Sequence, residues 1–514
     1  MKTENHKPFI SAIIISICTI LSRLTGMVRA MIMASFLGTG VIADALYVAI
    51  KLPNTFRRIF AEGAFSNAFI PFFSSKVKEN KNVANIFSLK VLKILIISLI
   101  LLTLIIEIFM PSVVKIINPG FISDAYKFDL TVKLSRICFP YVILISLASF
   151  FGSILNSIGH FWQYASVSVL LNIVIIGGLF LTNQFFTHAG YCVSWLLVLT
   201  GIVQTIFVAM FCCKYSVFPK NSKNIIDKHI EENRIDVKNF IKKLIPAIIS
   251  SGILQINIFI DGIFASFFAG AVSFLYYTDR MVNFPLSIIG YSLSVAILPS
   301  LSIAFKQKKI DAIKDLQTKT INIAIFFSFP AMLIFCILSK PIIAIIYERG
   351  AFTASDTRII ASMLTIYAIS IPFNVLIKIF FSCFYSQKNT KTPMQIGLFS
   401  LIFNIISNLI LFKIVNMYCV IISTTTSAIL SCLLAIILLK KNNNLYVKFS
   451  ELKFSLKVIL ISILSFGITP FALKDFNIFI ILIICGTIHL ALCLTTNIIN
   501  REFLKSLFQK QIKL

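Results

Sequence analysis

Long runs of apolar residues follow one another along nearly the whole chain, separated by short polar connections. Because a helix needs about 20 mostly apolar residues to cross a bilayer, each run is a candidate membrane span. We expect spans at residues 9–37, 41–75, 85–109, 128–155, 162–183, 190–213, 239–267, 271–302, 317–339, 357–386, 392–413, 417–440, 455–472 and 476–498. Pro53 and Pro285 lie inside the second and the eighth run, which predicts bent or broken helices there. The pattern predicts an all-α polytopic membrane protein of about 14 transmembrane helices.

An internal repeat relates the first part of the chain to the second at a nearly constant offset. The matching segments are ASFLG from Ala34 and ASFFAG from Ala265, AFIP from Ala68 and AILP from Ala296, Pro111 and Pro341, Pro140 and Pro372, and Asn172 and Asn404. Six spans separate the copies, and an even number of crossings leaves them parallel, related by an axis along the membrane normal. This predicts two pseudo-symmetric six-helix lobes around a central cavity, with two additional C-terminal helices. The expected segments are an N-lobe at 1–215, a basic cytoplasmic linker at 216–237, a C-lobe at 238–441, and the added helices with a basic tail at 442–514.

The chain has a formal net charge of +27, and most of its Lys and Arg residues lie in alternate connections between the apolar runs. Basic connections stay in the cytoplasm, so both termini are expected there, with Lys and Arg contacting anionic lipid headgroups. This distribution does not favour nucleic acid as a partner. The eleven cysteines include no CxxC pair, and the sequence has no phosphate-binding loop and no nucleophile with a partnered base. We therefore expect a transporter and not an enzyme.

Charged and polar residues nevertheless occur inside the predicted spans, where an isolated charge costs about 2.5 to 3.5 kcal/mol and must face water or a partner. In the first copy they are Arg23, Arg29, Asp44, Lys51, Asn54, Arg57 and Glu62, and in the second they are Asp261, Asp279 and Arg280. Several cations at membrane depth indicate an anionic ligand, and the guanidinium fork of Arg suits phosphate or pyrophosphate. Alternatively, neighbouring charges pair and hold helices together, as Arg58 would with Glu62 or Asp279 with Arg280.

Five motifs occur in a particular order: RLTGMVR from Arg23, ADALYVAIKLPNTFRRIFAEGAFSNAFIP from Ala43, LYYTDR from Leu275, ERGAFT from Glu348 and FYSQKNTKTP from Phe384. In order and spacing they closely resemble the lipid II flippases of the MurJ (MviN) family, within the multidrug/oligosaccharidyl-lipid/polysaccharide exporter superfamily. The resemblance covers nearly the whole chain. It implies a MurJ/MATE-like fold in the bacterial inner membrane. It also implies that the chain moves lipid II, the undecaprenyl-pyrophosphate-linked disaccharide pentapeptide, from the inner to the outer leaflet for peptidoglycan synthesis.

The resemblance also implies roles for individual residues. Arg23, Arg29 and Arg280 would engage the pyrophosphate. The positions that match polar sites of the second helix and its lateral portal are Asp44, Lys51, Asn54, Arg57 and Glu62, and Asp279 precedes the arginine of helix eight. Ala30 and Asn283 stand where the family often has acidic or, at the second position, Gln residues, so any charge network through these points is altered here.

Sodium binds some members of the family through helices seven, eleven and twelve, and the candidates here are Asp261, Asn404, Asn408 and Thr424. Asn408 stands where an acidic ligand is expected, so hydrogen bonding between helices is the alternative role of this group. No other cofactor is expected, and the membrane potential is the expected driving force. Lipid II, membrane lipids and cell-wall synthesis proteins are the expected partners.

Two other functions remain open at this stage: a flippase for another polyprenyl-linked oligosaccharide and a MATE-like multidrug antiporter. An antiporter for organic cations needs an acidic, aromatic cavity, and the surplus of intramembrane cations argues against it. A membrane-embedded glycosyl- or acyltransferase would need catalytic acids on an interfacial loop. The long cytoplasmic loop from Lys214 to Lys243 has only Asp227, Glu231, Glu232 and Asp236 amid basic residues, and it is typical of an amphipathic surface helix instead.

Overall fold

The computed structural model describes residues 7–60, 64–219, 236–242, 244–245, 255, 259–441, 452–473, 476–496 and 498. All regular elements within these ranges are helices. Among them, eleven are long and apolar enough to cross a membrane, or twelve if the bent pair Ala354–Ala368 and Ser370–Ser386 forms one span. The predicted all-α polytopic membrane fold is confirmed.

The twelve candidate spans coincide with twelve of the fourteen that the apolar runs predict. The expected span at 41–75 falls on two helices, the first of which carries Asp44, Lys51, Arg57 and Arg58 and is too highly charged to pass as a span. The expected span at 239–267 lies largely outside the described residues. The count of fourteen therefore stays a prediction.

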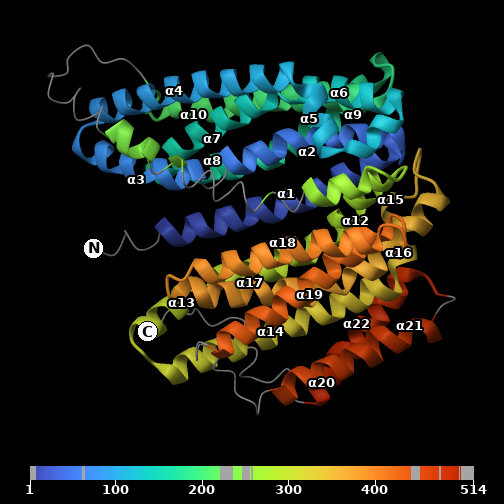
Figure 1. Cartoon of the computed structure of the whole chain (residues 1–514). Helices are drawn as coiled ribbons and strands as arrows, with labels where there is room; N and C mark the ends of the chain where they lie inside the picture. The colour runs from blue at the N-terminus through green and yellow to red at the C-terminus, as the bar shows by residue number, and fades with distance from the viewer. Residues whose placement is uncertain are drawn as a thin grey trace. The chain divides into compact units, whose positions relative to one another are not determined.

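The chain forms two compact units, Met1–Ser273 and Phe274–Leu514, which we call the N-terminal and C-terminal units and describe separately. The helices of the N-terminal unit (Figure 1) are α1 (Lys7–Leu37), α2 (Val41–Phe60), α3 (Ala64–Glu79), α4 (Lys81–Ile108), α5 (Met110–Ile117), η1 (Pro119–Ser123), α6 (Ala125–Cys138), α7 (Tyr141–Ser157), α8 (Trp162–Ala165), α9 (Val167–Thr182), η2 (Asn183–Phe185) and α10 (Ala189–Lys214). Within this unit α10 packs against α7 and α9, and α2 packs against α6.

The C-terminal unit follows the same plan. Its helices are α12 (Ala271–Pro285), which begins in the last residues of the N-terminal unit, η3 (Leu286–Tyr291), α13 (Ser292–Lys306), α14 (Ile310–Ile337), α15 (Ser339–Tyr347), α16 (Ala354–Ala368), α17 (Ser370–Ser386), α18 (Lys391–Leu411), α19 (Tyr418–Lys441), α20 (Leu452–Ser462), η5 (Ile463–Ile468), α21 (Thr469–Ala472) and α22 (Ile478–Thr495). In this unit α18 packs along α19, and α17 packs against α13, α14 and α19.

Corresponding helices of the two units have nearly equal lengths, as the sequence repeat predicts. The helices α4 and α14 both have 28 residues, and α7 and α17 both have 17. The short helices α5 and α15 have 8 and 9 residues, and α6 and α16 have 14 and 15. Gly38, which follows α1, and Gly270, which precedes α12, both adopt positive φ angles, of 58° and 74°. Glycine reaches this conformation without steric cost, which explains its presence at this turn in both copies.

Neither internal proline ends its span. Pro285 is the last residue of α12, and the π-helix η3 follows it within one continuous apolar span, Ala271–Lys306. The helix α2 runs through Pro53 and continues to Phe60. The predicted bends at these prolines stay predictions.

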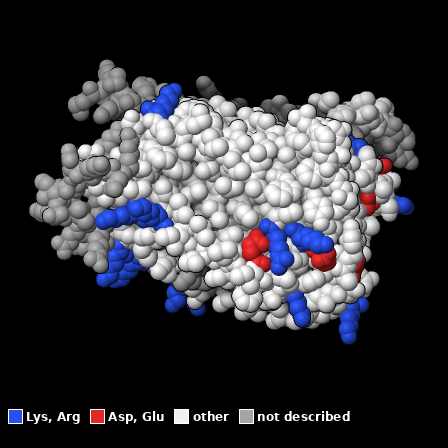
Figure 2. Space-filling model, turned by 90° about the horizontal axis from the view of Figure 1, so that it is seen from above, with Lys and Arg blue, Asp and Glu red and all other residues white. Residues whose placement is uncertain are grey.

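Apolar side chains fill the interior of each unit and also cover its outside. In the N-terminal unit the buried rings of Phe65, Phe69, Phe87, Phe150 and Phe240 pack with centroids 5.3 to 6.3 Å apart. Figure 2 shows one face of the molecule, on which a broad area without charged side chains separates basic residues from a group of mixed acidic and basic residues. Many large hydrophobic side chains are exposed, among them Ile97, Leu101 and Leu104 of α4, which suits contact with lipid chains.

Residues 259–273 belong to the N-terminal unit, where Asp44 of α2 and Asn118 and Gly120 of the α5–η1 turn form hydrogen bonds with them. The sequence repeat puts the start of the second copy earlier, at 238. The linker expected at 216–237 is described only at 216–219 and 236–237. The four expected segments, which rest on the repeat, therefore stay predictions.

Candidate functional site

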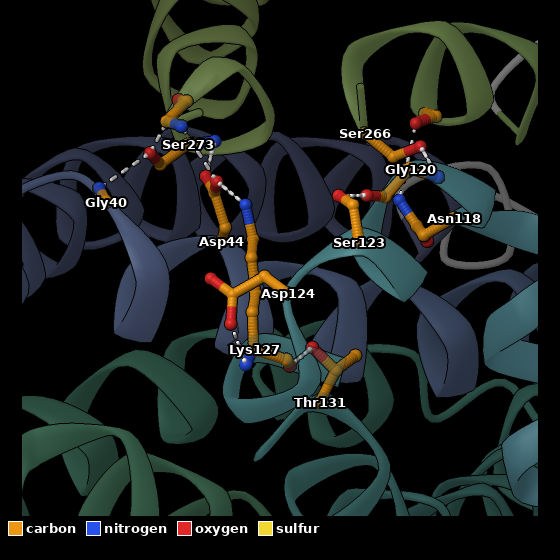
Figure 3. A network of polar contacts seen from close by, with 12 residues as sticks. Gly40, Asp44, Asn118, Gly120, Ser123, Asp124, Lys127, Thr131, Ser266 and Ser273 are labelled. Carbon is orange, nitrogen blue, oxygen red and sulfur yellow. Dashed lines mark hydrogen bonds and ion pairs between the residues drawn. The ribbon is translucent and has the colours of Figure 1, made fainter. Parts of the chain in front are cut away.

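The best-defined polar group in the N-terminal unit is an ion pair between Asp44 of α2 and Lys127 of α6. Lys127 Nζ lies 2.6 Å from Asp44 Oδ2, and the two side chains are 7% and 0% exposed. Asp124 caps the N-terminus of α6 by accepting from the Lys127 N–H at 3.0 Å, which sets the start of the helix that carries Lys127. The Lys127 ammonium also lies 4.0 Å from the centre of the Phe121 ring. Figure 3 shows this ion pair from close by.

The Asp44 carboxylate also binds the start of α12. Its Oδ2 accepts a hydrogen bond from Gly270 N at 3.0 Å, and its Oδ1 accepts one from Ser273 N at 2.8 Å (Figure 3). Ser273 lies in the first turn of α12 and Gly270 directly precedes the helix. An N–H group in the first turn has no partner within the helix, and the helix dipole favours negative charge there. One carboxylate thus joins α2, α6 and the start of α12.

A second bridge holds the segment just before α12. Asn118 Nδ2 donates to Gly262 O at 3.3 Å, and Gly120 N donates to Ser266 Oγ at 2.9 Å. A Cβ atom on Gly120 would lie 2.4 Å from the backbone of Ser266, so only glycine permits this approach. With the Asp44 contacts, the bridge fixes residues 262–273 to the rest of the N-terminal unit.

This geometry gives Asp44 a structural role in the conformation described here. A buried ion pair is stable in a low-dielectric interior only when its groups are also fully hydrogen-bonded. The Asp44 carboxylate accepts hydrogen bonds from three donors and so meets this condition. Its side chain has no exposed surface through which a ligand would be reached. This is the ion-pair alternative that the sequence left open, with Lys127 as the partner.

The basic residues predicted to bind pyrophosphate differ in exposure. Arg23 and Arg29 lie on α1, where Arg23 is exposed and Arg29 is half-buried. On α2, Lys51 and Arg57 are half-buried. A Cβ atom on Gly262 would lie 3.0 Å from Lys51 Nζ, so this ammonium reaches the backbone of the segment before α12.

The remaining candidates on α2 are less informative. Asn54 Nδ2 donates to Ile50 O at 2.9 Å within its own helix. Glu62 lies outside the described residues, so its predicted pairing with Arg58 stays a prediction.

In the C-terminal unit, Asp279 and Arg280 lie on α12. Asp279 is exposed, and its backbone oxygen accepts from Asn283 Nδ2 at 2.9 Å. Arg280 is half-buried, and its positive charge acts on the Tyr347 hydroxyl at the end of α15. Burial raises the pKa of Tyr347, and the Arg280 charge works in the opposite direction. The phenol therefore stays neutral beside the guanidinium.

Three of the four sodium candidates form a polar seam between α18 and α19. Asn404 Nδ2 donates to Thr424 Oγ1 at 3.2 Å, and Asn408 Nδ2 donates to Asn404 Oδ1 at 2.9 Å. Within the described ranges, Asn408 Oδ1 is buried without a hydrogen-bond partner, which fits an oxygen ligand for a cation. No group of three or more His, Cys, Asp or Glu residues suited to a metal occurs in the described part of the chain. Asp261, the fourth candidate, belongs to the N-terminal unit.

Sequence reasoning missed the roles of Lys127 and Lys378. Lys127 was expected in a connection, but it lies in the first turn of a 33-residue apolar span, Ala125–Ser157, and neutralises Asp44. Lys378 lies in the middle of α17 and was not considered. Its isolation within the run NVLIKIFFSCF is the signal that would have identified it.

The repeated helical units, the apolar spans and the charges within them define this chain as a polytopic membrane transporter. The family model described as lipid II flippase MurJ matches residues 33–486. The chain belongs to the MurJ family of lipid II flippases.

Individual relatives agree with this assignment. A protein of Rickettsia prowazekii named "Probable lipid II flippase MurJ" is 40% identical over 404 residues, which cover 78% of each chain. A protein of Rhizobium tropici with the same name is 35% identical over 77% of this chain and 74% of its own length. Both matches extend over most of both proteins, so the relationship is not limited to one motif.

Solved structures show the same fold. The structure titled "Lipid II flippase MurJ, inward closed conformation" matches with a TM-score of 0.80 and 26% identity, covering 96% of this chain and all of that one. An inward-facing MATE family multidrug transporter matches with a TM-score of 0.68 at 12% identity, covering 82% of this chain and 94% of that one. The second similarity is one of fold alone.

Proposed function

We propose that this chain moves lipid II from the inner to the outer leaflet of the bacterial cytoplasmic membrane by alternating access. The observation that carries this proposal is the match to the lipid II flippase family over residues 33–486. Membership of a family of flippases makes the protein a transporter and not a catalyst. The rival functions, transport of another polyprenyl-linked glycan or drug export, have only the fold similarity to MATE transporters in their support.

The chemistry of lipid II sets what the protein must do. Its pyrophosphate and glycopeptide cannot cross hydrocarbon, because charged and polar groups there cost several kcal/mol each. Its polyprenyl tail gains nothing from a polar interior. The protein must hold the headgroup among polar side chains and leave the tail in the bilayer.

The proposed pyrophosphate contacts are Arg23 and Arg29 of α1 and Arg280 of α12. Guanidinium groups bind phosphate oxygens through two parallel hydrogen bonds, which favours Arg over Lys for this task. Lys51, Asn54, Arg57, Glu62 and Asp279 are proposed as further polar contacts along the headgroup's path. The role of Asp44 in this scheme is to hold the start of α12, the helix that carries Arg280.

The membrane potential is the proposed driving force. Moving one charge across the membrane is worth about 2.3 kcal/mol per 100 mV, which biases the direction of transport. Sodium coupling is a second proposal, supported by the buried Asn408 Oδ1 on the α18–α19 seam. Both termini are proposed to face the cytoplasm, with membrane lipids and proteins of cell-wall synthesis as further partners.

The test is complementation of a bacterial strain depleted of its own lipid II flippase. The wild-type chain is expected to restore growth and the accessibility of lipid II at the outer leaflet. Arg23→Ala, Arg29→Ala and Arg280→Ala are each expected to abolish both at matched protein levels. A control variant, Lys319→Ala, removes an exposed lysine of the C-terminal unit and should behave as wild type. Growth supported by all three arginine variants would refute the pyrophosphate contacts, and failure of the wild-type chain would refute the function.

A further inference from the structure

Lys378 places a positive charge in the middle of α17, a helix of the C-terminal unit that is otherwise mostly apolar. It lies eight residues from either end of α17 (Ser370–Ser386), which corresponds to about 12 Å along the helix axis in each direction. The helix is the second half of the bent span that begins at Ala354. A lysine at this depth must be matched by a partner or by a polar ligand.

The contact that the structure gives this lysine is an aromatic ring. Lys378 Nζ lies 3.9 Å from the ring centre of Tyr291, the last residue of the π-helix η3. Among the described residues, no carboxylate lies within ion-pair distance of Lys378. The Tyr291 side chain is 55% exposed, so the site is open and not sealed in the core.

The backbone at Gly290 leaves room for the aliphatic part of the Lys378 side chain. A Cβ atom on the buried Gly290 would lie 3.1 Å from Lys378 Cδ and 3.6 Å from Val375 Cα, so the glycine leaves room for the side chain. Ser382, one turn further along α17, donates to Ser294 O at 3.1 Å and fixes the helix against α13. The π-helix between Pro285 and Ser292 presents Gly290 and Tyr291 to this face, and such turns frequently occur at functional sites.

The cation–π contact with Tyr291 does not by itself offset the free-energy cost of a lysine within a membrane span. On insertion scales the cost of a lysine rises to about 2.5 to 3.5 kcal/mol at the centre of a span, which is the upper limit for Lys378. A cation–π contact at an open site returns about 0.5 to 1 kcal/mol. Because leucine or methionine would pack in this position without the charge, the remaining cost points to a ligand that binds the ammonium.

We propose that Lys378 and Tyr291 form a binding site for an oxyanion of the polyprenyl-linked headgroup. This inference rests on the proposed function and adds a contact that lies on α17 and η3. The ammonium binds the oxyanion, and the tyrosine ring holds the ammonium in place and offers a flat face to the adjoining sugar. The oxyanion is either a phosphate of the pyrophosphate or a carboxylate of the peptide, and the experiment separates these two sources.

The experiment measures binding to the purified full-length protein in nanodiscs. The two probes are lipid II and undecaprenyl pyrophosphate, which lacks sugar and peptide. Lys378→Gln is expected to weaken lipid II binding about tenfold or more, since a hydrogen bond to a charged group is lost. Lys378→Arg should bind within a few-fold of wild type because it keeps the charge. Lys319→Gln, which removes an exposed lysine paired with Asp315, is the matched control and should bind as wild type.

The pattern across probes identifies the oxyanion. If Lys378→Gln weakens both probes equally, the ammonium binds the pyrophosphate; if it weakens only lipid II, it binds the peptide carboxylate. Unchanged binding of both probes by Lys378→Gln overturns the inference. Should this variant fail to fold, Tyr291→Leu provides the test, because it keeps the ammonium and removes its support. A weaker affinity in Tyr291→Leu supports the site, and an unchanged affinity overturns it.

Failure of this inference is distinguishable from failure of the proposed function. If wild type binds lipid II and Arg280→Ala loses it while Lys378→Gln and Tyr291→Leu do not, only the present inference falls. If wild type binds neither probe, the proposed function falls first.

Discussion

Lys127 and Asp44 are 83 residues apart in the chain, and their side chains form a buried ion pair with Nζ and Oδ2 separated by 2.6 Å. The same carboxylate accepts hydrogen bonds from Gly270 and Ser273 at the start of α12. A charge that the sequence suggested as a ligand contact is therefore part of a three-way junction within the N-terminal unit. Both the stability of this unit and the position of its last residues, 270–273, should depend on it.

Replacing Asp44 with Asn should destabilise the protein by about 3 to 5 kcal/mol, because the change leaves the Lys127 ammonium buried without a counter-charge. Adding Lys127→Met to Asp44→Asn should recover a large part of this loss, since a buried ion pair is often replaceable by neutral groups of similar size. Thermal unfolding of the detergent-purified protein measures both effects.

The pair formed by Lys133 and Asp129 on the same helix is the control. Its side chains are 57% and 60% exposed, and an exposed pair contributes about 0 to 1 kcal/mol. Lys133→Ala should therefore change stability little. An Asp44→Asn protein that unfolds at the wild-type temperature would contradict the structural role of the buried pair.

Gly120→Ala should destabilise the N-terminal unit by about 1 to 3 kcal/mol, the usual cost of overpacking. The added methyl group would lie 2.4 Å from the backbone of Ser266, and the two segments would have to separate. Gly177→Ala on α9 is the matched control because nothing lies within 4 Å of its added Cβ. This change should stabilise the protein by about 0.5 to 1 kcal/mol through helix propensity. Equal unfolding temperatures for the two variants would show that the Gly120 contact is not tight.

The spans and the repeat were predictable because both rest on local patterns. Apolar runs of sufficient length located twelve candidate spans, and the matched glycines Gly38 and Gly270 have the same backbone conformation in the structure. The hydropathy pattern does not reveal which charged residues pair with one another. The partner of Asp44 is on α6, and its other two donors are backbone groups more than 220 residues away.

One error follows from reading a charge by its neighbours in sequence. Lys127 follows Asp124 and Tyr126 and resembles a loop residue, although its ammonium is buried. The helix α2 continues through Pro53 to Phe60. A proline removes one backbone donor, and packing on the rest of the helix can compensate for this loss.

Sodium should stabilise the protein if the α18–α19 seam binds it. A ligand present at 100 times its dissociation constant adds about 2.7 kcal/mol of stability. Replacing sodium with N-methylglucamine should then lower the unfolding temperature of wild type, and Asn408→Leu should remove this dependence because Asn408 Oδ1 is the proposed ligand. Ser407→Ala, which removes the partner of Ser423 on the same seam, should keep the sodium dependence. An unfolding temperature of wild type that is independent of sodium would leave hydrogen bonding as the role of this seam.

Tyr347→Phe should raise stability or leave it unchanged. Within the described ranges, the Tyr347 hydroxyl is buried without a hydrogen-bond partner, and such a group costs about 1 to 3 kcal/mol. The ring would keep its contacts with Tyr277 and Phe352, whose centroids lie 5.0 and 5.7 Å away.

Tyr141→Phe is the matched control. Tyr141 is also fully buried, but its hydroxyl donates to Gln204 Oε1 at 3.3 Å, so the loss of this hydroxyl should destabilise the protein by about 1 kcal/mol. A flipping assay on the Tyr347→Phe variant tests whether the Tyr347 hydroxyl also contributes to transport. Stability that falls by as much as in Tyr141→Phe would mean that the Tyr347 hydroxyl has a hydrogen-bond partner in the membrane-embedded protein. Flipping that falls while stability holds would assign the hydroxyl a role in transport, through Arg280 or the substrate.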